Sequence, residues 1–113
     1  MTDCLFCKIA AGDVPSDSVY RSDAVVAFRD INPGAPTHLL VIPVQHIASA
    51  ADLGAGEGLL LAEIFEVMAG LAKSEGLDNG WRVVTNVGAD GGQTVPHLHF
   101  HLLGGRQMAW PPG

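Results

Sequence analysis

Three histidines alternate with apolar residues near the end of the chain. The segment PHLHFHLLGG, residues 96–105, places His97, His99 and His101 at every second position. Successive side chains of a β-strand point to opposite faces, so this spacing predicts a strand that begins at Pro96 and carries three imidazoles on one face. The other face would carry the apolar residues of the segment, Leu98, Phe100 and Leu102.

Three interpretations of this strand compete. In the first, the histidines are solvated and do no chemistry, but three in perfect alternation in a chain with only five histidines speak against it. The second is a zinc site, although His97 and His101 would lie roughly 13 Å apart at strand rise, too far for one metal unless the strand bends. In the third, His99 is a nucleophile that attacks phosphorus, since a neutral imidazole is competent near pH 7 and the phosphoramidate formed can be hydrolysed.

The preceding loop favours the nucleophile. The segment GADGGQT, residues 88–94, contains three glycines whose backbone can approach a ligand closely, followed by an amide and a hydroxyl. Glycine-rich turns form concavities of successive N–H groups that bind anions. Glycine-rich loops are common in hairpins. This one indicates an anion site because it directly precedes the three histidines.

Size and composition limit the classes of function. The chain has 113 residues, of which 48% are hydrophobic and 16% charged, which predicts a single domain over residues 1–113 with a real core. A net charge of −6 argues against long nucleic acids but leaves a mononucleotide possible. We see no signal peptide and no apolar stretch of membrane-spanning length, so we expect a cytoplasmic protein whose two cysteines are thiols or metal ligands.

The pattern of the chain predicts an α+β fold with an antiparallel sheet. We expect a helical turn that ends at Gly12 and one long helix between Gly56 and Gly76, where apolar residues recur at helical spacing. Short strands are expected around 19–20, 24–30, 37–44 and 81–87, in addition to the histidine strand. Residues 88–96 read as a loop, and the tail after Gly104 as irregular.

The His-x-His-x-His motif followed by two apolar residues resembles that of the histidine triad (HIT) superfamily. The segments FRDINPGAPTHLLVIP, NVGADGGQTVPHLHFHLLGGRQ and WPPG are similar to its nucleotide-binding branch, known as HINT, over essentially the whole chain. The resemblance implies a five-stranded antiparallel sheet with one long helix and a short N-terminal helix, paired in a homodimer into a ten-stranded sheet. It also implies hydrolysis of purine nucleoside 5′-phosphoramidates to a nucleoside monophosphate and an amine, with no organic cofactor.

The resemblance also assigns roles to residues. His99 would be the nucleophile that forms a nucleotidyl-histidine intermediate, His101 would contact the phosphate and the leaving-group side, and His38 would support the triad from the neighbouring strand. His97 is the remaining triad member, and Asp30 would accept hydrogen bonds from the ribose. The base would lie in an apolar slot of Phe6, Ile9, Val14, Phe28 and Ile31. The phosphate loop would use Asn86, Gly92, Gln93 and Thr94, and Trp110 would reach towards the partner subunit's site.

Two cysteines in CLFC have a spacing suited to one zinc ion. Some prokaryotic relatives resemble this chain in having that pair together with two distant histidines, which here would make the ligand set Cys4, Cys7, His46 and His97. Cys₂His₂ is a closed structural set with no open position for catalysis. The alternative is a pair of inert thiols with a surface His46.

The sequence therefore predicts a dimeric phosphoramidase with a structural zinc ion. Two alternatives stay open: a nucleotide-binding or scaffold protein with incidental hydrolysis, and a dinucleoside polyphosphate hydrolase or nucleotidylyl transferase on the same fold. Fold analogy cannot decide among them, and the WPPG tail favours the phosphoramidase.

Overall fold

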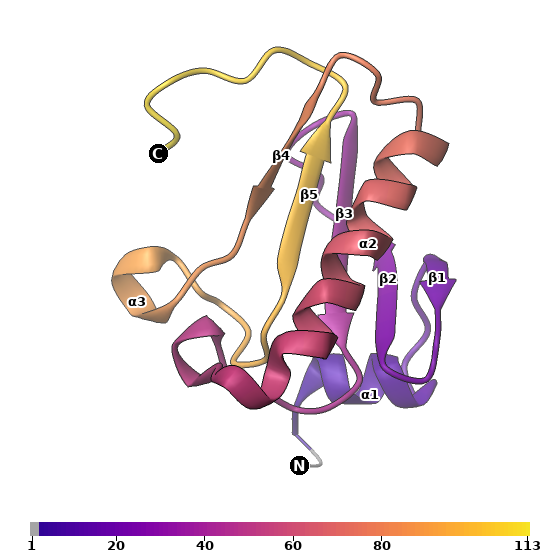
Figure 1. Cartoon of the computed structure of the whole chain (residues 1–113), viewed down its shortest axis with the longest axis vertical. Helices are drawn as coiled ribbons and strands as arrows, with labels where there is room; N and C mark the ends of the chain where they lie inside the picture. Colours follow the sequence, from indigo (N-terminus) through magenta and orange to yellow (C-terminus); the bar gives the residue numbers. More distant parts are fainter. Residues whose placement is uncertain (1–2) are drawn as a thin grey trace.

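A five-stranded antiparallel sheet in the order β1-β2-β3-β5-β4 lies at the centre of the molecule (Figure 1). The computed structural model describes residues 3–113. Its strands are β1 (Ser18–Arg21), β2 (Val25–Arg29), β3 (Thr37–Pro43), β4 (Trp81–Val84) and β5 (Phe100–Gly104). Its helices are α1 (Leu5–Ala11), α2 (Gly58–Ser74) and α3 (Gly88–Gly91), with two 3₁₀ turns at Ala50–Asp52 and Ala55–Glu57. This is the α+β fold with one long and one short N-terminal helix that the sequence predicts.

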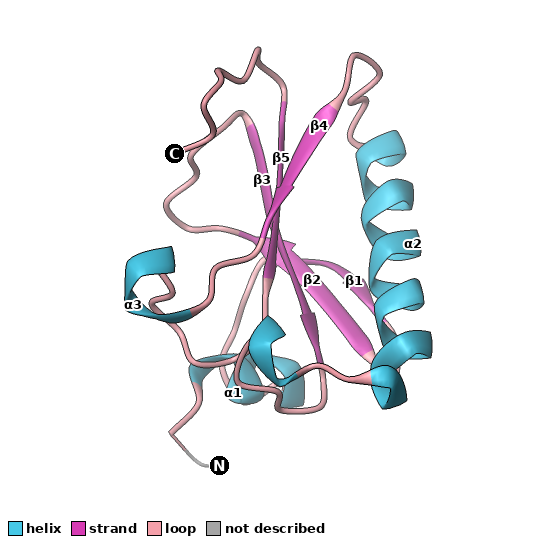
Figure 2. Cartoon of the chain, turned by 60° about the vertical axis from the view of Figure 1, so that its left-hand side comes forward, coloured by secondary structure: helices cyan, strands magenta, loops and turns pink. Residues whose placement is uncertain are grey.

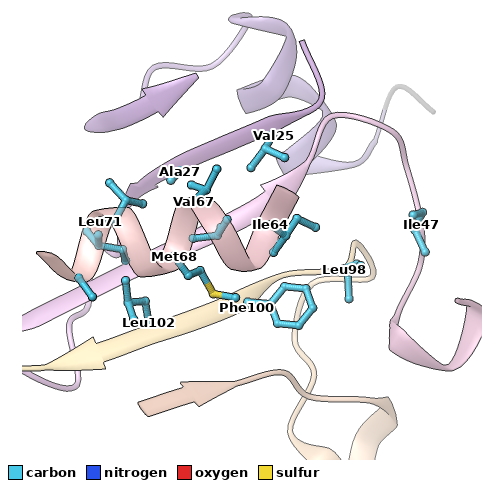
Figure 3. Packing of buried hydrophobic residues seen from close by; sticks show 13 residues of the cluster. Val25, Ala27, Ile47, Ile64, Val67, Met68, Leu71, Leu98, Phe100 and Leu102 are labelled. Atoms are coloured by element: carbon cyan, nitrogen blue, oxygen red, sulfur yellow. The ribbon is translucent and has the colours of Figure 1, made fainter. Parts of the chain in front are cut away.

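The long helix α2 runs along one face of the sheet (Figure 2). Its buried residues Ile64, Val67, Met68, Leu71 and Ala72 recur every three or four positions, which is the stripe that a helix presents to a sheet. They pack on side chains from alternate positions of the strands beneath (Figure 3). The strand residues of this core are Val25, Ala27, Leu39, Val41, Phe100 and Leu102. Phe65, another apolar residue of α2, is 48% exposed.

Gly76 ends α2 as the sequence predicts. It has a φ of +74°, a conformation that favours glycine. The Gly76 N–H donates to the Lys73 carbonyl, and the Leu77 N–H donates to the Ala72 carbonyl at 2.9 Å. These two bonds form a Schellman motif, which satisfies the last carbonyls of the helix and turns the chain towards β4.

The short helix α1 packs on the opposite face of the sheet. Its buried Phe6, Ile9 and Ala10 contact strand residues that alternate with those of the first core, namely Val26, Phe28, Leu40 and Ile42. Cys4 caps its N-terminus by accepting the N–H of Cys7 at 3.3 Å. Both cysteines lie close to histidines: Cys4 Sγ is 3.3 Å from His97 Nδ1, and Cys7 Sγ is 3.3 Å from His46 Nδ1.

The histidine strand is shorter than the sequence predicts. β5 begins at Phe100, so His97, Leu98 and His99 precede it, and the expectation of a strand from Pro96 is wrong. The N–H of His97 donates to the Val95 carbonyl at 2.8 Å, and that of Leu98 donates to the Ile47 carbonyl at 2.6 Å. Both donors are therefore used outside the β3–β5–β4 ladder, whose first register partners on β5 are Phe100 and His101. The alternation of faces nevertheless continues, because Leu98, Phe100 and Leu102 all lie in the core under α2.

Two further expectations need correction. The strand expected over residues 81–87 ends at Val84, and the loop expected over 88–96 contains the single-turn helix α3. Gly88 and Gly92, with φ of +72° and +84°, allow the chain to enter and leave this turn. Along residues 3–113, no helix combines the length and apolar character that crossing a membrane requires.

Met68 offers a test of the core between α2 and the sheet. It is fully buried, so Met68→Ala leaves a cavity and should lower the free energy of unfolding by about 2–5 kcal/mol. Leu59→Ala on the same helix, where the side chain is 90% exposed, should change it by less than about 0.5 kcal/mol. Urea unfolding of both variants measures the difference, and equal effects would contradict this packing.

Candidate functional site

His99 lies just before β5 with one ring nitrogen bound and the other free. Its Nδ1 is 2.7 Å from the carbonyl oxygen of His97. A carbonyl only accepts, so Nδ1 carries the proton and Nε2 of the neutral ring has a lone pair. Within residues 3–113, every completely buried side-chain nitrogen or oxygen has a hydrogen-bond partner. Because His99 Nε2 has none in that region, this atom must keep contact with solvent although the residue is only 5% exposed.

A chain of hydrogen bonds fixes the proton positions on two other histidines. The Gly34 N–H donates to His38 Nδ1 at 2.8 Å, which places the His38 proton on Nε2. That Nε2–H donates to His101 Nδ1, also at 2.8 Å. The proton of neutral His101 is therefore on Nε2, which by the same reasoning as for His99 reaches solvent. The rings of His99 and His101 lie 5.0 Å apart between centroids, so the ring with the free lone pair neighbours the ring with the N–H donor.

Burial keeps the imidazoles of His38 and His101 uncharged. It lowers the pKa of His101 to about 4, with smaller contributions from His99 and His38, while Asp30 acts in the opposite direction. Burial also lowers the pKa of His38, against the attraction of Asp30. At neutral pH the hydrogen-bond chain therefore contains neutral rings, and His101 serves as a donor that carries no charge.

Asp30 lies at the end of β2 against the same chain. Its Oδ2 is 3.4 Å from His38 Nε2, and its Oδ1 accepts the N–H of Asn32 at 2.8 Å. The carboxylate is thus held beside the His38–His101 pair, at the position from which the resemblance implies contact with a ribose.

A second cluster joins both cysteines to His46 and His97. The Nδ1 atom of His97 is 3.3 Å from Cys4 Sγ, 3.5 Å from Cys7 Sγ and 3.2 Å from His46 Nδ1. The Nε2–H of His97 donates to the Pro43 carbonyl at 2.9 Å, so its Nδ1 holds a bare lone pair. Burial lowers the pKa of His97, which keeps the imidazole in the neutral form that ligates metals.

These distances fit a tetrahedral zinc ion. Zinc bonds of about 2.0–2.1 Å to nitrogen and about 2.3 Å to sulfur place neighbouring ligand atoms roughly 3.3–3.8 Å apart. All four ligand atoms of the cluster lie within 4.8 Å of one another. One lone pair cannot accept from three neighbours at once in good geometry, so their convergence on His97 Nδ1 is better explained by a cation than by hydrogen bonds. The bond to Pro43 is the outer contact that typically orients a ligating histidine.

Asp30, His38 and His101 also form a group with metal-binding residue types, but their geometry is different. The two nitrogens are 2.8 Å apart, which is a hydrogen-bond distance and shorter than the separation of two zinc ligands. The Gly34 N–H donates to His38 Nδ1, so the His38 proton is on Nε2. A metal would need a lone pair on that atom. This group is a hydrogen-bond chain.

The residues predicted to hold the base divide between core and surface. Phe6, Ile9 and Phe28 are buried in the core under α1, and Val14 is half-buried against it. The edge of the Phe6 ring approaches His99, with centroids 5.1 Å apart. Ile31 is 91% exposed. The structure brings the aromatic residues to the triad but leaves Ile31 outside their cluster.

The loop residues predicted to hold phosphate have different surroundings. The Gln93 amide is fully engaged with backbone: its nitrogen donates to the Ala48 and Val95 carbonyls, and its oxygen accepts the Gly88 N–H. Gln93 thereby fixes the loop beside the histidines. Gly92 and Thr94 are exposed, and Asn86 is half-buried. Trp110 is 82% exposed in the tail.

Sequence reasoning missed three groups that orient the histidines. The Pro43 carbonyl and the Gly34 N–H are backbone atoms, which side-chain patterns do not reveal. The third is the hydroxyl of Thr85, which donates to the His99 carbonyl at 2.8 Å. A polar residue next to a run of apolar strand residues was the only available signal.

A family model described as HIT domain matches residues 11–108. The chain belongs to the HIT family. It is 50% identical over 111 residues to an uncharacterised HIT-like protein of Synechococcus elongatus, covering 98% of this chain and 97% of the relative. It is 48% identical over 111 residues to the 14 kDa zinc-binding protein of Zea mays, covering 96% and 87%. The crystal structure of a HIT family hydrolase from Legionella pneumophila has a TM-score of 0.97 and 54% identity, covering 98% of this chain and all 100% of that chain.

The HIT assignment confirms the family and fold that the motif implies. The five-stranded antiparallel sheet, the long helix α2 and the short N-terminal helix α1 are the elements that the resemblance implies.

The low pKa of His101 predicts a stability that falls in mild acid. The unfolded HIT chain takes up the proton near the ordinary histidine pKa of about 6.5, whereas folded His101 resists it down to about 4. The stabilisation is thus complete above about pH 6.5 and is lost as the pH falls towards 4, by no more than about 3 kcal/mol. Urea unfolding between pH 7 and 4 should show a flatter pH dependence in His101→Asn than in the original chain. Parallel curves for the two proteins would contradict this prediction.

Proposed function

We propose that this HIT protein hydrolyses purine nucleoside 5′-phosphoramidates through a nucleotidyl-His99 intermediate. The observation that carries the proposal is the pair of solvent-contacting Nε2 atoms, a lone pair on His99 beside an N–H on His101. A nucleophile beside a fixed donor suits attack on a phosphoryl group, where charge on the oxygens must be stabilised. The description of the Legionella neighbour as a hydrolase supports this class of reaction.

The proposed reaction has two steps. The lone pair of His99 Nε2 forms a bond to phosphorus while the bond from phosphorus to the amine nitrogen breaks, and that nitrogen takes a proton from water. Hydroxide or water then attacks phosphorus, the bond to His99 Nε2 breaks, and the ring recovers its lone pair. The net change consumes one water molecule and releases the amine and a nucleoside monophosphate.

Neighbouring residues would hold the substrate for this reaction. The His101 Nε2–H would donate to a phosphoryl oxygen, and the N–H of Thr94 would act on the same charge. Gly92 would shape the loop, because its own N–H already donates to the Ala89 carbonyl at 3.1 Å. Asp30 would accept from the ribose hydroxyls. Phe6, Ile9 and Phe28 would form the buried floor for the base, with Val14 and Ile31 adding apolar surface. Asn86 would contact the phosphate. The side-chain amide of Gln93, which is hydrogen-bonded to backbone groups, would keep the loop in place.

A homodimer is part of the proposal. β4 is an outer strand of the sheet, and an edge strand can pair with another copy. Trp81 on that strand is 41% exposed. Pairing of two copies would extend the sheet to ten strands and bring Trp110 towards the partner's site.

We further propose that Cys4, Cys7, His46 and His97 hold a structural zinc ion. The ligand distances support it, as does the zinc-binding description of the maize relative. Burial, and then the neighbouring Cys4, raise the pKa of the Cys7 thiol above its ordinary value, so a bound cation would be needed to hold Cys7 as a thiolate. The ion would tie the N-terminal segment to residue 97 and leave His99 free.

Removal of zinc should lower stability more than it changes the chemical step. We expect about one zinc per chain by elemental analysis, and a loss of about 2 kcal/mol or more in the free energy of unfolding after chelation. Cys7→Ser should bind zinc more weakly and melt at a lower temperature. No bound zinc together with an unchanged melting curve would contradict the site.

The nucleophile is tested by AMP release from a lysine or tryptamine adenosine phosphoramidate. His99→Ala should fold and bind AMP but lose turnover by roughly three orders of magnitude or more, because the substitution removes the proposed nucleophile. Equal turnover in both proteins would refute the role of His99. Binding of AMP without turnover by the original chain would favour a nucleotide-binding scaffold, and cleavage of dinucleoside polyphosphates in preference would favour the other hydrolase.

A further inference from the structure

Thr85 touches the backbone of His99 from the neighbouring segment. It follows the last residue of β4, and its Oγ1–H donates to the His99 carbonyl oxygen at 2.8 Å. The residue is half-buried, so this bond is partly shielded from water. Thr85 has no place among the substrate-holding residues described above.

The hydroxyl of Thr85 binds the chain just outside the region where β5 pairs with its neighbouring strands. β5 has its first register partners at Phe100, opposite Val41 of β3, and at His101, opposite Val84 of β4. His99 is therefore one residue outside the pairing with β3 and two residues outside the pairing with β4. A side-chain hydroxyl from the end of β4 continues the attachment at the position where backbone pairing ends.

Two hydrogen bonds restrain His99, one to its ring and one to its carbonyl oxygen. Its Nδ1–H donates to the carbonyl of His97, and its own carbonyl accepts from Thr85. The rings of Phe6 and His101 lie at 5.1 and 5.0 Å between centroids. The peptide plane after residue 99 begins at the Cα atom that carries the ring, and the Thr85 hydroxyl holds the carbonyl of this plane in one orientation.

We propose that Thr85 is a positioning residue that fixes the direction of the His99 Nε2 lone pair through the backbone of residue 99. This inference rests on the proposed function and deepens it, because it assigns the aim of the nucleophile to a residue that does not touch the substrate. Displacements of about 1 Å at a reacting atom can cost about 10²-fold in rate, so a partial loss of restraint should be measurable.

The test compares Thr85→Val with Thr85→Ser. Valine preserves the β-branched shape and removes the hydroxyl, whereas serine preserves the hydroxyl. With the adenosine phosphoramidate as substrate, Thr85→Val should lower kcat roughly 10-fold with KM within about 2-fold, and Thr85→Ser should retain most of kcat. If the valine variant fails to fold, Thr85→Ala takes its place in the same comparison.

A second measurement needs no substrate. Nitrogen-15 NMR of the His99 ring should show the Nδ1–H tautomer in the original chain and in Thr85→Ser, and a mixture of tautomers in Thr85→Val. Full kcat and an unchanged tautomer in the valine variant would overturn the role of Thr85, as would an equal loss of kcat in the serine variant. An inactive original chain would instead refute the proposed function, and the tautomer comparison would still decide the role of Thr85.

Discussion

The hydrogen bond from His99 Nδ1–H to the carbonyl of His97 is the contact on which the rest of the site depends. Residues 97–99 precede β5, and the carbonyl of His97 faces the ring two residues later. The bond sets the proton of His99 on Nδ1 and leaves Nε2 free. The side chain of His97 lies next to the two cysteines. One residue thus orients the nucleophile through its backbone and joins the metal cluster through its ring.

A second constraint is the absence of charge on the neighbouring imidazoles. A charged His101 would lose the Nδ1 lone pair that accepts from His38, and the chain that begins at the Gly34 N–H would break. Burial prevents this by lowering the pKa values of His38 and His101. Desolvation therefore keeps these rings neutral, as the proposed chemistry requires. Backbone donors and acceptors determine which ring nitrogen carries the proton.

Much of the fold could be predicted from the sequence because its signals are local. Helix α2 follows from its apolar spacing and from the glycine at position 76, and the two faces of the histidine segment follow from alternation. The start of β5 could not be predicted. A His-x-His-x-His pattern is equally compatible with a ladder-paired strand, and the donors of His97 and Leu98 are instead used by Val95 and Ile47, partners that only the tertiary structure supplies. The spacing of Cys4 and Cys7 indicated a metal site, but the choice of His46 and His97 as their partners rested on resemblance, since these histidines are far away in the chain. The role of Thr85 could not be predicted from the sequence, because its hydrogen-bond partner is a backbone carbonyl.

The central claim is that the Nε2 atom of His99 forms a bond to phosphorus, and trapping the intermediate tests it most directly. The protein is mixed in excess with an adenosine phosphoramidate, quenched under alkaline conditions that preserve a bond between phosphorus and imidazole, digested and analysed by mass spectrometry. The account predicts an adenylyl group on the peptide that contains His99, attached to that residue and decaying as AMP appears. Turnover with an adduct on another residue would contradict it, as would turnover with no adduct at any point of a rapid-quench time course in which formation of the intermediate is faster than its hydrolysis.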